Sequence, residues 1–80
     1  MAKRNIKKLV NELNAIFKEN EKSIRVQEGH DGGSWFILTV DEYNIENMQY
    51  AQFVVVMFLA AKNIKIKNYG RCGNHWVYEI

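Results

Sequence analysis

Apolar residues recur at helical spacing over the first quarter of the chain and divide it into two faces. The apolar stripe consists of Ile6, Leu9, Val10, Leu13, Ile16 and Phe17. Lys, Asn and Glu occupy most positions between them, and this period predicts an amphipathic helix from about Lys3 to Asn20. Its outer face is mildly basic, because Arg4, Lys7 and Lys8 gather opposite the stripe.

A strict alternation of apolar and polar residues follows. Ile24 and Val26 alternate with Arg25 and Gln27, a glycine-rich stretch covers 29–33, and an apolar run comes next at 35–40. This pattern predicts a β-hairpin. Its second strand is apolar on both faces, as in a central strand that helices cover on one side and another molecule covers on the other.

A second helix is predicted from a cap at Asp41 or Asn44 to about Lys62, with Asn63 as a left-handed terminator. Matching the phase of the first helix predicts a core face of Asn47, Tyr50, Ala51, Val54, Met57, Phe58 and Ala61. A second apolar stripe then lies outward, and we predict a protein interface there made of Met48, Gln52, Val55, Val56 and Leu59. The β-branched run at 54–56 leaves a buried strand as the alternative, but the length of the segment favours a helix.

The chain ends in a second hairpin that echoes the first. Ile64 and Ile66 alternate with Lys65 and Lys67, the turn is predicted at 70–74, and a strand follows. Both hairpins contain G-x-x-G followed by a tryptophan, so we predict one domain over 1–80 with an internal repeat of about 3–40 and 44–80.

The predicted order αββαββ belongs to the α+β class. It gives a four-stranded antiparallel sheet with two helices on one face, in the strand order third, fourth, second, first. Such an arrangement arises from a ferredoxin-like fold whose first strand has moved to the end, or from duplication of an αββ unit.

Composition narrows the function classes. Eighty residues bury one thin core and leave little room for an enclosed active site, so we expect no enzyme. The single cysteine and the absence of a signal-peptide pattern predict a cytoplasmic protein, and no apolar run is long enough to span a membrane. Abundant Lys, Asn and Ile without proline fit an AT-rich genome such as that of a low-GC bacterium or its phage.

Candidate metal and catalytic groups are few. Cys72 and His75 have C-x-x-H spacing, and His30 and Asp31 occupy the corresponding turn of the first hairpin. Zinc sites normally pair their ligands more closely, and the Cys-His pair has no evident oxyanion hole. The glycine-rich turns lead into strands rather than into helix N-termini, which favours hairpin turns over phosphate loops. We therefore expect no catalytic residue, no metal and no cofactor.

An alternative role comes from the predicted open face of the sheet, where cations and aromatic rings would hold single-stranded nucleic acid or RNA. The residues assigned to it are Arg25, Gln27, Trp35, Lys65, Lys67, Tyr69 and Arg71. The net charge is only +2, so this reading depends on where the cations lie.

The sequence favours a small non-catalytic module that binds protein. The bound protein is either a second copy of the chain or a larger partner, for which the module is an inhibitor or an adaptor. Apolar surface in excess of one core is the reason. By analogy of size and composition, we expect a phage or mobile-element product such as a host-defence inhibitor of the anti-CRISPR kind.

Overall fold

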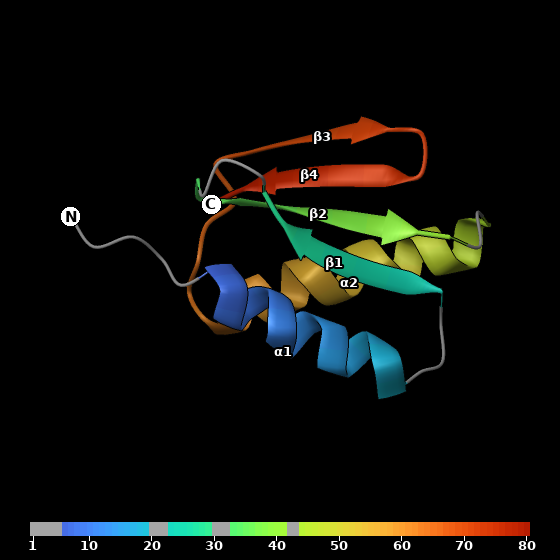
Figure 1. Cartoon of the computed structure of the whole chain (residues 1–80), viewed down its shortest axis with the longest axis horizontal. Coiled ribbons are helices and arrows are strands. Elements are labelled where there is room, and N and C mark those ends of the chain that lie inside the picture. The colour runs from blue at the N-terminus through green and yellow to red at the C-terminus, as the bar shows by residue number, and fades with distance from the viewer. Residues whose placement is uncertain (1–5, 20–22, 30–32, 42–43) are drawn as a thin grey trace.

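A computed structural model describes residues 6–19, 23–29, 33–41 and 44–80. The chain forms two helices and four strands (Figure 1). In chain order they are α1 (Ile6–Glu19), β1 (Ile24–Glu28), β2 (Trp35–Val40), α2 (Ile45–Ala61), β3 (Asn68–Cys72) and β4 (His75–Glu79). All paired strands are antiparallel, in the order β1-β2-β4-β3, and both helices lie on one face of the sheet. The predicted α+β class and strand order are confirmed.

The first helix follows the sequence prediction closely. Leu13 and Phe17 are fully buried, and Ile6, Leu9 and Val10 are nearly so, because α1 packs its apolar stripe against the sheet, mainly on β1. The predicted first turn at Lys3 to Asn5 and the predicted end at Asn20 lie outside the described residues.

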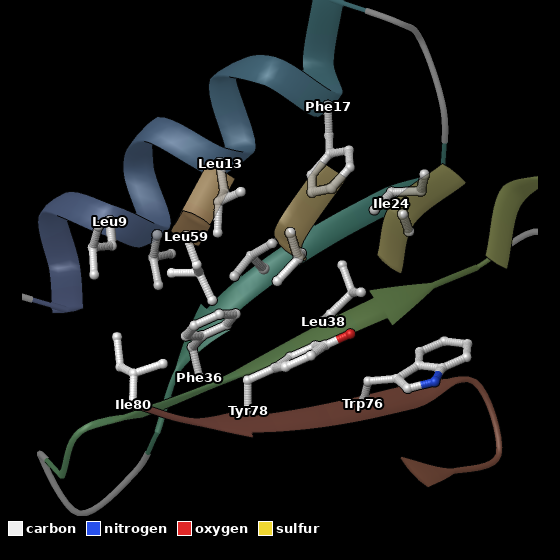
Figure 2. Close-up of a cluster of buried hydrophobic side chains, with 14 of the residues drawn as sticks. Leu9, Leu13, Phe17, Ile24, Phe36, Leu38, Leu59, Trp76, Tyr78 and Ile80 are labelled. Atoms are coloured by element: carbon white, nitrogen blue, oxygen red, sulfur yellow. The ribbon is translucent and has the colours of Figure 1, made fainter. Parts of the chain in front are cut away.

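Strand alternation directs one set of side chains to the helices and the other to the opposite, open face of the sheet. The set that faces the helices is Ile24, Val26, Phe36, Leu38, Val40, Trp76, Tyr78 and Ile80, all of them buried. Figure 2 shows several of these residues meeting Leu13, Phe17 and Leu59 from the helices. Phe36 and Tyr78 stack with ring centroids 5.4 Å apart, so the core continues across β2 and β4.

The second helix has a different phase from the predicted one. Its buried residues are Asn47, Ala51, Val55 and Leu59. Val55 and Leu59, predicted to face outward, are fully buried, whereas Met57 and Ala61, predicted to lie in the core, are exposed. The prediction failed because α2 is apolar nearly all round, so its apolar positions do not define one face.

The second hairpin also begins later than predicted. Residues 64–67 form no strand, β3 starts at Asn68, and the turn is the two residues Gly73 and Asn74. Gly73 has φ +63°, which suits the first central position of a type II′ turn. The two tryptophans of the apparent repeat lie on opposite faces, since Trp76 is in the core and Trp35 is on the open face.

Candidate functional site

The most exposed apolar surface among the described residues lies on α2. We call it the α2 outer face, and it consists of Ile45, Glu46, Gln49, Phe53, Val56, Met57 and Ala60. At 100° per residue these positions fall on one side of the helix, opposite the buried stripe. Ile45 is 69%, Phe53 63%, Met57 52% and Val56 46% exposed. Four large apolar side chains therefore share one helix surface with two polar residues, Glu46 and Gln49, both near the start of the helix.

Local sequence signals define the helix that presents this face. At its start, the Asn44 side-chain Oδ1 accepts a hydrogen bond of 2.9 Å from the Asn47 backbone N–H, which caps the helix. At its end, Asn63 has φ +58° and Ile64 N–H donates to the Leu59 carbonyl at 2.9 Å. These contacts form a Schellman motif, so α2 ends at a defined residue. The predicted caps at Asn44 and Asn63 are confirmed.

Packing of α2 keeps its outer face away from the rest of the described chain. The Tyr50 ring meets the Phe17 ring of α1 edge-on at 6.1 Å, and Val55 and Leu59 reach the sheet side of the core. Burying one such side chain completely contributes about 1.5–3 kcal/mol. A partner that covers the four half-exposed side chains would therefore gain on the order of 4 kcal/mol of binding free energy from them. The α2 outer face is therefore suited to an apolar partner surface.

The interface predicted from the sequence overlaps this face at one residue. Val56 is exposed, Met48 and Gln52 are half-buried, and Val55 and Leu59 belong to the core. The prediction that Val55 and Leu59 are exposed is wrong. The predicted interface did not include Ile45, Phe53 and Met57, although Glu46 and Gln49, which are exposed on the same side of the helix, were an available signal for the solvent side.

The residues predicted to bind nucleic acid do not share one surface. Arg25, Gln27 and Trp35 lie on the open face of the sheet, but Tyr69 and Arg71 lie on the helix side of β3, because they are opposite Tyr78 and Trp76. Lys65 and Lys67 are exposed and precede β3. The prediction that all seven project together is therefore wrong.

The reason is a local irregularity before β3. Lys67 N–H donates to the Glu79 carbonyl at 2.7 Å, and Asn68 is also the register partner of Glu79. Two consecutive residues thus meet one partner, as in a β-bulge, which reverses the alternation of side chains beyond it.

Two of the cations have neighbours within the chain. Arg25 forms an ion pair of 2.8 Å with Asp41, and the Arg71 guanidinium lies 5.1 Å from the centroid of the Trp76 ring.

The Tyr69 ring stacks on the Tyr78 ring, with the two ring centroids 6.0 Å apart. Burial, with a smaller contribution from Tyr69, raises the pKa of Tyr78 from 10.0 to about 12.

A shallow hollow of about 520 Å³ lies beside β3. Its lining residues are Trp35, Asn68, Tyr69, Gly70, Val77 and Glu79. Gly70 leaves the space open, because a Cβ built there meets nothing within 4 Å. The indole of Trp35 lies over Gly29, where a Cβ would clash with the ring. The hollow is thus mainly apolar, with Asn68 and Glu79 as polar groups.

Cys72 and His75 are register partners at the end of the second hairpin, and both are exposed. The His75 Nδ1 is 2.9 Å from Thr39 Oγ1, a neighbour on β2. Across the described ranges, no three His, Cys, Asp or Glu side chains group in a way that would hold a metal ion. His30 and Asp31, the other ligands considered from the sequence, lie outside the described residues.

None of the helices in the described part of the chain combines the length and apolar character needed to cross a membrane. Comparison of the chain with family models, with curated proteins and with solved structures found no match.

Proposed function

We propose that this chain is a small non-catalytic module that binds another protein through the α2 outer face. The observation that carries the proposal is the exposure of Ile45, Phe53, Val56 and Met57 on one helix surface. Scattered apolar residues are normal on protein surfaces, whereas a contiguous group is typical of interfaces. The aromatic and Met side chains of the group are types enriched in interface centres.

The geometry supports protein binding better than nucleic-acid binding. Glu46, in the first turn, is the one charged residue of the α2 outer face, and depletion of charge distinguishes the centre of a protein interface. The cations that would contact phosphates are divided between two faces of the sheet, and one of them is engaged with Asp41. Nucleic-acid binding stays a prediction from the sequence.

The wider role follows from this surface and from the sequence. We propose that the module is an inhibitor or an adaptor of a larger partner protein. By analogy of size and composition, we also propose that it is a phage or mobile-element product. Cys72 is an exposed free thiol, which suits a reducing compartment such as the cytoplasm. The order of elements suits either a duplicated αββ unit or a permuted ferredoxin-like fold.

Substitution of the α2 outer face tests the proposal. Tagged wild-type protein and the variants Phe53→Asp and Val56→Asp are used to capture partners from a lysate of the source organism, with nuclease added. Ala15→Asp, an exposed alanine on α1, is the matched control for an added carboxylate. Light scattering on the same samples reports self-association.

The proposal predicts that a captured protein, or a dimer of the chain, is retained by Ala15→Asp and lost in both α2 variants. An aspartate buried in an apolar contact is unfavourable, but at a solvent-exposed site it is tolerated, so circular dichroism of the variants should stay native. Equal capture by Phe53→Asp and the wild type would refute the proposal.

A further inference from the structure

The two edge strands of the sheet differ in whether their outward backbone groups are hydrogen-bonded. At the β1 edge, the Asn14 side chain of α1 acts as a substitute strand. Its Oδ1 accepts from the Val26 backbone N–H at 2.8 Å, and its Nδ2 donates to the Val26 carbonyl at 2.9 Å. Val26 is the central one of the three β1 residues whose backbone groups point away from β2, so the centre of this edge is satisfied inside the chain.

The β3 edge has no such cover in the described part of the chain. β3 pairs only with β4, and all five of its residues are exposed. Cys72 and His75 close the two-residue turn as a hydrogen-bonded pair, so alternation directs the backbone N–H and C=O of Tyr69 away from β4. No described residue bonds these two groups in the way that Asn14 bonds Val26. This edge presents the donor and acceptor that an added strand would use.

The hollow described above adjoins this edge on the open face. Gly70 is the β3 residue without a side chain there, and Trp35 and Val77 are the apolar residues beside it. On an added strand, the residue opposite Gly70 would project over the glycine and into the hollow. An aromatic or large aliphatic side chain suits this space, whereas a carboxylate would meet Glu79.

The charges beside β3 are mostly positive. Arg71 and Tyr69 share the helix side of β3, and the exposed Lys65 and Lys67 precede the strand. Acidic residues on either side of the apolar one would lie on the same side as Arg71, since side chains alternate along a strand. Opposite charges across a strand pair are favourable, and like charges are not.

We propose that the β3 edge binds an extended segment of another protein, which adds to the sheet as a fifth strand. The segment places an apolar side chain opposite Gly70 in the hollow and acidic side chains on the Arg71 side. A second copy of this chain suits the site poorly. The β3 residues on the open face of the sheet are Asn68, Gly70 and Cys72, none of them large and apolar, and a second β3 would bring further cations to the edge.

This site involves none of the residues of the α2 outer face, so either proposal can fail without the other. The probe is a fluorescein-labelled, amidated peptide with the sequence Asp-Thr-Glu-Phe-Glu-Thr-Asp, and its affinity is measured by fluorescence anisotropy. Two control peptides replace the acidic residues by Lys, or Phe by Ala. The full-length chain is compared with Tyr69→Pro, Tyr69→Thr and Gly70→Val.

Proline at position 69 removes an N–H that points to solvent, so the β3–β4 ladder survives, and Tyr69→Thr controls for loss of the ring. A Cβ at position 70 meets nothing within 4 Å, so valine there extends a side chain into space that the added strand would use. We expect Tyr69→Pro to bind about tenfold or more weakly than Tyr69→Thr, and Gly70→Val and both control peptides to show a similar loss.

Three results would overturn the proposal. The first is no binding of the acidic peptide to the wild type below millimolar concentration. The second is that the Lys peptide binds the wild type as tightly as the acidic peptide does, or that Tyr69→Pro binds the acidic peptide as tightly as Tyr69→Thr does. The third is a dimer of the wild-type chain that Tyr69→Pro dissociates, because a second copy would then be the occupant of the edge. If Tyr69→Pro is unfolded by circular dichroism, the Gly70→Val comparison decides, and unchanged affinity in that variant also overturns the proposal.

Discussion

Truncation of Leu59 tests the phase of α2, on which the location of the binding surface depends. Leu59 is 1% exposed and lies within the core cluster, with Phe36 and Leu13 nearby in Figure 2. Leu59→Ala removes three buried carbon atoms and leaves a cavity that a small core closes only in part. Met57, two positions earlier, is 52% exposed, so Met57→Ala removes atoms that water already contacts.

The expected magnitudes differ clearly. Leu→Ala in a core costs about 2–5 kcal/mol, while an exposed substitution usually changes the free energy of unfolding by about 0.5 kcal/mol or less. The whole chain has 80 residues, so its total stability is about 4–12 kcal/mol. Leu59→Ala thus removes a large part of it, and each kcal/mol lowers the melting temperature of a domain this size by about 4–8 °C.

Urea denaturation followed by circular dichroism measures both variants under the same conditions. The structure predicts a strongly lowered midpoint for Leu59→Ala and a nearly unchanged one for Met57→Ala, with unaltered denaturant slopes. The reverse order would mean that Met57 lies in the core and that the α2 outer face is misplaced.

Three further variants test other parts of the structure. The pKa of Tyr78 is about 12 in the folded chain and 10.0 in the unfolded chain. The free energy of unfolding is therefore unaffected by this group below pH 10 and falls by about 2–3 kcal/mol between pH 10 and 12. In urea titrations across this pH range, Tyr78→Phe should remove most of the fall. Asn14→Leu should lower the free energy of unfolding by about 1–3 kcal/mol, because it leaves the Val26 backbone groups without their partner, and faster hydrogen exchange at the Val26 amide would show the cause. Gly29→Ala should displace the Trp35 indole and shift its NMR resonance, at a cost of about 1–3 kcal/mol, and an unchanged indole signal would contradict the contact.

The reliability of the sequence prediction differed between the helices for a physical reason. In α1, charged residues opposite the apolar stripe define its phase, and the predicted stripe is buried except for Ile16, which is half-buried. In α2, apolar residues surround the helix, so periodicity predicts a helix but not its orientation. The caps at Asn44 and Asn63 were predictable because they depend on side-chain chemistry and backbone conformation at single positions.

The candidate sites depended on features that alternation does not reveal. Ile64 and Ile66 alternate with lysines as a strand would, yet they are partly buried in an irregular segment that connects α2 to β3. The irregularity at Lys67 then moved Tyr69 and Arg71 to the helix side. The open β3 edge and the hollow at Gly70 result from tertiary pairing and were not predicted.

Site-specific crosslinking at position 53 tests most directly whether the α2 outer face binds a protein. The photoreactive residue p-benzoylphenylalanine replaces Phe53 in one sample and Ala15, exposed on α1, in the control, and both are irradiated in cells of the source organism. A covalent adduct with a defined protein, or with a second copy of the chain, is predicted at position 53 and not at position 15. No adduct at position 53, or the same adducts at both positions, would contradict the proposal that this face is the binding surface.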